Sequence, residues 1–186
     1  MSFDLGTKNF AWCESNDEEI IETKVIQLID NDKKVKGKIA LDIDTVYSAI
    51  SRVFKRFRFS DIKRIFIEKQ VNRNKDCRLI EAVMISILNE KKKYKNYEYE
   101  IIRVSPTLKL KHHIKRGEVK NHDIKKDAIK FCNYRYGLCE LTEHESDAIL
   151  QMEGYYLEYF IKEQKKKRKS VPSLLIPNWI NLEYDF

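Results

Sequence analysis

The chain has 186 residues, which suits one compact domain with a sizeable core and is short for two. Hydrophobic residues make up 42% of the chain and charged residues 35%, a balance that excludes an intrinsically disordered protein. The 36 Lys and Arg residues outnumber the 29 Asp and Glu residues, and the resulting charge of +7 favours a polyanionic partner, nucleic acid first. No G-x-x-x-x-G-K-[ST] loop occurs, which excludes a P-loop enzyme.

The spacing of the cysteines and the length of the apolar runs indicate in which kind of compartment the protein is expected. Cys13, Cys77, Cys132 and Cys139 lack the C-x-x-C spacing of structural zinc sites, and no secretory signal precedes them. We therefore expect reduced thiols in a cytosol-like compartment. No apolar run approaches the roughly 18 residues that a membrane helix needs, so we expect a soluble protein.

The first part of the chain predicts three strands. Short apolar runs at residues 3–6 and 10–12 flank a polar turn and predict a hairpin. Residues 20–29 are rich in β-branched side chains and predict a third strand, which completes an antiparallel meander.

A helix, a strand and a second helix follow. Apolar residues repeat at helical spacing over 46–57, behind Asp42 and Asp44, either of which can cap the helix. Residues 65–67 form a short, wholly apolar run typical of a strand buried on both faces. The pattern over 80–88 then predicts a helix, so this part indicates a strand-to-helix crossover.

The last elements are one more strand and two helices. Residues 97–104 alternate as a strand, 124–131 predict a modest helix, and 148–160 predict a strong one. Thr142 and Glu145 have the spacing of a capping box for the strong helix.

The order of these elements predicts an α/β fold with a mixed five-stranded sheet, an antiparallel three-strand meander at one edge, and flanking helices. We place the domain at residues 1–162. Residues 163–186 are expected to be a basic segment and a C-terminal tail that packs on the domain.

Acidic residues fall at the ends of the predicted strands. Asp4 lies in an apolar strand just before Gly6, and Glu68 ends a second apolar strand, where open α/β sheets bind ligands. His144 and Asp147 are three residues apart and share a helix face. Carboxylates gathered in this way repel one another unless a cation joins them, and Mg²⁺ and Mn²⁺ prefer carboxylate oxygens. The pattern therefore predicts a metal site.

Each of these residues also has an ordinary interpretation. An Asp beside a Gly is more often a turn residue, a Glu at a strand end is usually solvated, and His144 can simply face solvent at a helix start. Glu143 lies four residues before Asp147 and can replace His144 on the metal-binding face. Only the joint arrangement favours the metal site.

Four motifs in this order resemble those of RuvC-like Holliday junction resolvases, especially the branch in poxviruses and other large DNA viruses. They are Asp-x-Gly-x-x-Asn at Asp4 to Asn9, Ile-Glu-x-Gln at Ile67 to Gln70, the segment Val104 to Lys109, which resembles Ser/Thr-Pro-x-x-x-Lys with a loose lysine register, and Asp/His-x-x-Asp-Ala at His144 to Ala148. The match spans about residues 1–160. Many relatives carry Asp at the position of His144, and Lys109 and Lys111 both fit the lysine position.

The resemblance implies an RNase H-like fold and a crossover junction endodeoxyribonuclease. It assigns Asp4, Glu68, His144 and Asp147 to two Mg²⁺ or Mn²⁺ ions per active site, and it places Lys109 or Lys111 against the scissile phosphate. A four-way junction is nearly two-fold symmetric, so the family works as a homodimer on branched DNA. A role in viral DNA recombination and in concatemer or genome processing follows from the same resemblance.

Basic residues supply the expected DNA contacts. One group of these residues follows the strand that ends at Glu68, and the other group begins after the lysine motif. The basic residues of the second group could instead form an ordinary solvated helix face that does not bind DNA. The expected contacts are Arg73, Asn74, Lys75, Arg78, Lys111, Lys115, Arg116 and Lys120.

The sequence offers two candidates for the dimer surface and two for the location in the cell. We favour the exposed face of the 80–88 helix over the tail around Leu174, Leu175, Ile176 and Trp179 as the interface. A viral chain is expected at cytoplasmic replication sites, with the nucleus as the alternative because residues 165–169 form a Lys/Arg-rich run. Two other functions remain: an RNase H-like nuclease that acts on flaps or RNA–DNA hybrids, and a noncatalytic DNA-binding protein on the same fold.

Overall fold

The computed structural model describes residues 1–16, 19–29, 34–35, 38–39, 41–71, 74–119 and 123–167. Five strands form one sheet in the order β3-β2-β1-β6-β7. They are β1 (Ser2–Asp4), β2 (Phe10–Ser15), β3 (Ile20–Ile26), β6 (Arg64–Glu68) and β7 (Glu100–Val104). The first three strands are antiparallel neighbours, whereas β6 is parallel to both β1 and β7. The predicted mixed sheet with a three-strand meander is confirmed.

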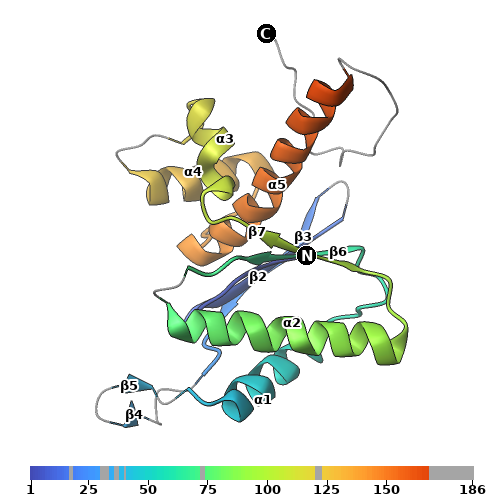
Figure 1. The fold of residues 1–186 in the computed structure, drawn as a ribbon. Coiled ribbons are helices and arrows are strands. Elements are labelled where there is room, and N and C mark those ends of the chain that lie inside the picture. Colours follow the sequence, from blue (N-terminus) through green and yellow to red (C-terminus); the bar gives the residue numbers. More distant parts are fainter. Residues whose placement is uncertain are drawn as a thin grey trace.

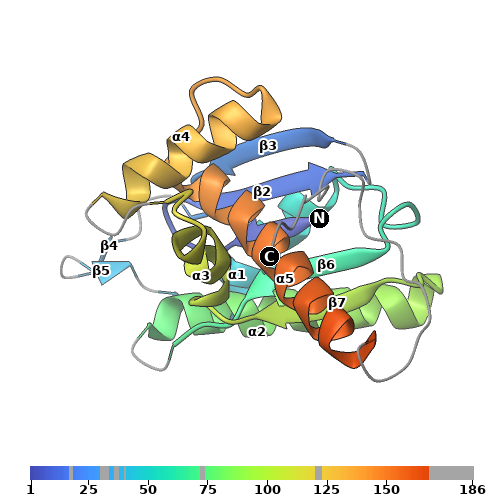
Figure 2. The ribbon, with the colours of Figure 1, turned by 90° about the horizontal axis from the view of Figure 1, so that it is seen from above.

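The helices cover both faces of this sheet, as Figure 1 shows. On one face lie α1 (Ile43–Phe54) and α2 (Lys75–Lys95). On the other lie α3 (Leu108–Lys115), α4 (Ile124–Tyr136) and α5 (Glu143–Lys167), and α5 crosses the sheet in the view from above (Figure 2). A separate two-stranded pair, β4 (Lys34–Val35) and β5 (Lys38–Ile39), precedes α1 and was not predicted.

Strand alternation divides the sheet between two cores. Phe3 on β1 and Ile65 and Ile67 on β6 belong to the cluster that packs with α1 and α2. Phe66 on β6 belongs instead to the cluster that packs with α5. Because successive side chains point to opposite faces, Asp4 and Glu68 are on the α5 face of the sheet.

The helix ends are capped as the sequence predicts. Asp42 rather than Asp44 caps α1, since its side chain accepts a hydrogen bond from the Thr45 amide at 2.7 Å. At the start of α5, the Thr142 amide donates to Glu145 Oε2 at 3.0 Å and the Glu145 amide donates to Thr142 Oγ1 at 3.2 Å. The capping box is therefore confirmed.

Some features differ from the expectations. Helix α3 was not among the predicted elements. Helix α5 continues to Lys167 and so crosses the proposed boundary after residue 162. Residues 168–186, which hold most of the tail, lie outside the described part of the chain. None of the described helices combines the length and the apolar character needed to cross a membrane.

Candidate active site

The pairing of β1 with β6 brings the first two acids together. The parallel register sets Ser2 beside Phe66 and Phe3 beside Ile67, so the next position along sets Asp4 beside Glu68. Neighbouring strands lie about 4.8 Å apart, and both acids are at the carboxyl ends of their strands. Beyond Asp4 the chain turns at Gly6, where a Cβ atom would lie only 2.5 Å from the Asn9 carbonyl oxygen. Glycine therefore permits this tight turn.

Helix α5 supplies a histidine to the same place. His144 Nδ1 lies 2.9 Å from Asp4 Oδ2, and His144 Nε2 lies 2.9 Å from Asn9 Nδ2. A neutral ring protonated at Nδ1 satisfies both contacts, because it donates to the carboxylate and accepts from the amide. The hydrogen bond to Asp4 raises the pKa of His144, although partial burial opposes this. Asn9 thus holds the histidine from the turn after β1, a role the motif alone did not assign.

One lysine joins the two remaining acids. Lys109 Nζ donates to Glu68 Oε2 at 3.0 Å and to Asp147 Oδ2 at 2.6 Å. The side chains are only 14%, 15% and 21% exposed, respectively, so water screens these contacts weakly. Burial raises the pKa of both carboxyl groups, with Lys109 opposing the rise. Burial alone would lower the pKa of Lys109, but Asp147 and Glu68 raise it.

Helix α3 reaches the acids because it packs very closely on α5. A Cβ atom at Gly154 would lie 2.5 Å from the Leu108 carbonyl oxygen and 3.0 Å from Lys109 Cα. Glu158, one turn further along α5, accepts hydrogen bonds from Lys111 Nζ at 2.9 Å and from His112 Nε2 at 2.8 Å. Gly154 and Glu158 therefore fix where Lys109 lies.

A second polar cluster, built on the buried residues His113 and Glu153, also holds α3 in place. His113 is inaccessible to solvent, and its Nδ1 lies 2.7 Å from Glu118 Oε2. Its Nε2 lies 3.5 Å from Glu153 Oε2, and Arg135 Nε lies 3.0 Å from Glu153 Oε1. These contacts link α3, α4 and α5 to one another.

The structure places the alternative residues clearly. Lys109 lies among the acids, whereas Lys111 pairs with Glu158. His144 contacts Asp4, whereas Glu143 Oε1 pairs with Lys125 Nζ at 2.6 Å.

The expected DNA contacts are placed less uniformly. Lys75 and Arg78 are exposed on the first turns of α2, and Lys115 is exposed on α3. Asn74 caps α2, since it accepts a hydrogen bond from the Cys77 amide at 3.2 Å. Arg116 Nη1 is 3.4 Å from Glu118. Arg73 and Lys120 lie outside the described residues.

The donor set suits a hard cation, but it is arranged around a lysine. Three carboxylates and an imidazole are ordinary ligands for Mg²⁺ or Mn²⁺. Within the described ranges, however, no three His, Cys, Asp or Glu side chains are grouped closely enough to hold a metal ion. The Lys109 ammonium lies instead between Glu68 and Asp147. The chemistry of these residues therefore suits a divalent cation, and in this structure the Lys109 ammonium pairs with two of the carboxylates.

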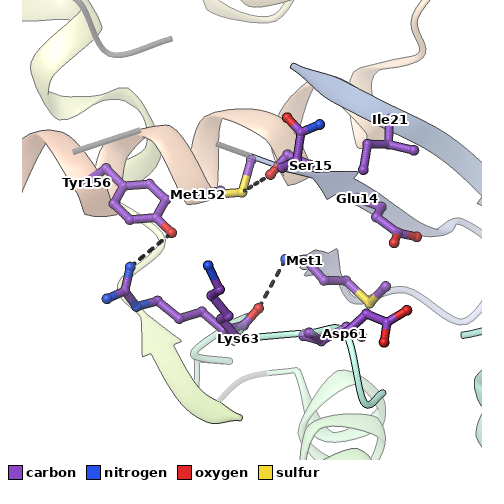
Figure 3. A pocket seen from close by; sticks show the side chains of 11 residues that line it. Met1, Glu14, Ser15, Ile21, Asp61, Lys63, Met152 and Tyr156 are labelled. Atoms are coloured by element: carbon purple, nitrogen blue, oxygen red, sulfur yellow. Dashed lines mark hydrogen bonds between the residues drawn. The ribbon is translucent and has the colours of Figure 1, made fainter. Parts of the chain in front are cut away.

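A cavity of about 360 Å³ lies at the other end of the sheet (Figure 3). Met1, Arg64 and Tyr156 are among the residues that line it. The Met1 amino group donates to the Arg64 carbonyl oxygen at 3.0 Å, and Arg64 Nη1 donates to the Tyr156 hydroxyl at 3.4 Å. None of the predicted site residues is among the described residues that line this cavity, so it is separate from the acidic residues.

The sheet order and the covering helices define an RNase H-like α/β domain. Comparison with solved structures agrees. The structure of Thermus thermophilus RuvC matches with a TM-score of 0.55 at 11% identity, over 87% of this chain and 95% of that chain. The yeast mitochondrial Holliday junction resolvase Ydc2 matches with a TM-score of 0.51 at 14% identity, over 91% and 83%. No family model and no curated protein sequence matches the chain. At these identities the similarity establishes a RuvC-like fold.

Proposed function

We propose that this protein is a metal-dependent nuclease that resolves four-way DNA junctions. The observation that supports this most is the gathering of three acids from two strand ends and one helix start. Glu68 and Asp147 share the Lys109 ammonium group, while Asp4 is set beside Glu68 by the strand register and pairs with His144. Buried acids brought together in this way have little structural benefit, since their mutual repulsion costs stability. They do suit a reaction at a phosphodiester that needs cations.

The proposed metal ligands are Asp4, Glu68, His144 and Asp147, with two Mg²⁺ or Mn²⁺ ions per active site. Such ions, when bound, activate a water molecule and stabilise the leaving 3′ oxygen. His144 hydrogen-bonds the Asp4 carboxylate, and Asn9 in turn hydrogen-bonds the imidazole ring, so a ring nitrogen would exchange one of these contacts for the ion when it acts as a ligand. Lys109 is already in the site and brings positive charge to where a scissile phosphate would bind.

DNA contacts and assembly belong to the same proposal. Lys75 and Arg78 are exposed at the amino end of α2, where helix geometry favours phosphate, and Arg73, outside the described residues, remains a proposed contact. A homodimer would pair two active sites on a two-fold symmetric junction. The side of α2 that faces away from the sheet exposes Ala82 and Ser86, and it remains our proposed interface. A viral role at cytoplasmic or nuclear replication sites is part of the proposal as well.

The test compares three substrates. We expect the purified chain with Mg²⁺ or Mn²⁺ to cut a four-way junction faster than a DNA flap or an RNA–DNA hybrid. Preferential cutting of the flap or the hybrid would support the other RNase H-like nuclease. Binding of all three without cutting would support a noncatalytic DNA-binding protein.

Matched variants test the site itself. Asp4→Asn, Glu68→Gln and Asp147→Asn should each lower junction cleavage at least 100-fold, while junction binding stays near wild type. Glu143→Gln is the control and should leave cleavage unchanged, because Glu143 pairs with Lys125. His144→Asp should remain active, since a carboxylate is an ordinary ligand for Mg²⁺. Retention of more than a tenth of the activity in any acid variant would remove that residue from the proposed site.

A further inference from the structure

Basic side chains gather at the end of the molecule opposite the acidic residues. Residues 55–63 lead into β6, and α2 is followed by β7, so both segments lie at the starts of these parallel strands. Glu68 lies at the far end of β6. The 21 residues of α2 span about 31 Å at 1.5 Å per residue, and this length separates the two ends. We call the basic end the distal basic surface; its residues are Lys55, Arg56, Arg58, Lys91, Lys93 and Lys95.

Aromatic anchors turn these basic groups outward. Phe59 is buried, with its ring 5.2 Å from Phe54 and 5.8 Å from Tyr99. The neighbouring residues Arg56 and Arg58 are exposed. Since Phe59 fixes the backbone between α1 and β6, the two arginines are held on the surface.

The two segments form one continuous surface. Lys91 Nζ lies 5.0 Å from the centre of the Phe59 ring, a cation–π contact that joins α2 to the segment after α1. Tyr97, just beyond α2, stacks on Phe59 at 6.3 Å. The basic residues of both segments are therefore neighbours.

Acids do not neutralise this surface. Among the described residues, none of Arg56, Arg58 and Lys93 forms an ion pair, whereas Lys111 and Lys125 elsewhere do. Of the nearby acids, Asp61 accepts from Ser60 at 2.7 Å and Glu90 accepts from Tyr47 at 3.4 Å, while Glu98 is exposed on the segment between α2 and β7 and, in the described part of the chain, forms no ion pair with these basic residues. Helix C-termini favour basic residues, but that effect falls off within the last turn, and Arg58 lies beyond the end of α1 at Phe54. The helix dipole thus explains only part of the cluster.

We propose that the distal basic surface binds the phosphate backbone of duplex DNA, away from the acidic residues. The inference rests on the proposed function in taking a DNA arm as the ligand, but it does not depend on cleavage. Exposed basic side chains with no fixed acidic partner gain most from a polyanion, because binding releases its condensed counterions. A separation of about 31 Å corresponds to about nine base pairs of B-DNA, so an arm longer than this reaches from one site to the other.

The test uses two triple variants that each remove three positive charges. Arg56→Gln/Arg58→Gln/Lys93→Gln changes the distal basic surface, and Lys24→Gln/Lys126→Gln/Lys130→Gln changes exposed lysines on β3 and α4 as the control. The probes are four-way junctions with hairpin-capped arms of about 6 or about 20 base pairs, in EDTA so that no cutting occurs. Affinity is measured by fluorescence anisotropy over a range of salt concentrations.

We expect the surface variant to lose at least 10-fold in affinity for the long-armed junction only. Its log–log salt slope should become shallower by about 0.9 for each phosphate that the variant no longer neutralises. The control variant should bind both junctions like the wild type. Unchanged binding of the long-armed junction by the surface variant would overturn the inference, and so would equal weakening with both arm lengths.

Cleavage assays keep this inference separate from the proposed function. In Mg²⁺ the surface variant should cut the short-armed junction at the wild-type rate. A second outcome is that the surface variant loses affinity for the long-armed junction only, while the wild type cuts no junction in Mg²⁺. That pair of results would overturn the proposed function and leave the inference supported.

Discussion

Lys109 and Asp147 meet through a contact of 2.6 Å between ammonium and carboxylate, and the same ammonium lies 3.0 Å from Glu68. The lysine comes from α3 and the acids come from α5 and β6, so this one group links three elements. It compensates the repulsion between acids that the fold brings to one place. In our proposal, the chain without metal is therefore held together by its own cation.

The substitution Lys109→Met should destabilise the protein. Loss of the ammonium leaves two partly buried carboxylates without a partner, and breaking such a pair costs about 3 kcal/mol. Urea unfolding in EDTA measures this loss. If divalent cations bind these acids, Mg²⁺ or Mn²⁺ should raise the melting temperature of Lys109→Met more than that of the wild type.

The matched control is Lys111→Met. Its ammonium is more exposed and pairs with Glu158, so its loss should cost at most about 1 kcal/mol. Equal destabilisation by the two variants would show that the contacts of Lys109 stabilise the fold no more than those of an exposed surface lysine.

The direction in which Gly154→Ala changes the stability of the protein tests the packing of α3 on α5. In a helix interior without close neighbours, alanine is more stable than glycine by about 1 kcal/mol. At this position the added Cβ atom would lie 2.5 Å from the Leu108 carbonyl oxygen, so α3 must shift, and overpacking of this kind costs about 1 to 3 kcal/mol. We expect lower stability and weaker junction cleavage. A gain in stability would mean that α3 does not pack on α5 as described.

Much of the fold follows from local patterns in the sequence. Alternation and β-branching predict the meander, the apolar run at residues 65–67 predicts β6, and helical spacing predicts the cores of α1, α2 and α5. The acidic residues are predictable for the same reason, since Asp4 and Glu68 end apolar strands. These features depend on neighbours in sequence.

The features that the sequence did not predict depend on contacts between distant segments. Helix α3 has a weak apolar pattern, and its basic and histidine residues gain their partners only on α5, where Glu153 and Glu158 lie. Gly154 carries no local signal that another backbone approaches it. A glycine and two acids, Glu153 and Glu158, among the apolar residues of the 148–160 pattern were the available hint, but they do not identify the partner.

Thiol reactivity tests the packing around the cysteines, of which Cys13 and Cys132 belong to the core cluster that packs with α5. Among the four cysteines only Cys139 is exposed, while Cys13, Cys77 and Cys132 are buried. Burial raises the pKa of Cys13 to about 12, and it also raises the pKa of Cys77 and of Cys132. With an aromatic disulfide reagent at pH 8, one thiol should react fast and three only as the protein unfolds, and Cys139→Ser should remove the fast phase. A second fast thiol would contradict the packing described here.

The Glu158 carboxylate predicts a pH-dependent anchor for α3. The hydrogen bond from Lys111 lowers its pKa to about 2, with partial burial opposing and His112 adding to the effect. A lowered pKa in the folded state contributes stability that is present above the unfolded value of about 4.3 and is lost as the pH falls through about 2. The stability difference between wild type and Glu158→Gln should therefore be largest at pH 7, at most about 1 kcal/mol because solvent screens the group, and should shrink below about pH 4. Thermal unfolding at pH 7, 4 and 3 measures it, with Glu98→Gln, on the exposed segment between α2 and β7, as the control that should change nothing. A difference that stayed constant or grew as the pH fell would show that Glu158 does not hold α3 through its charge.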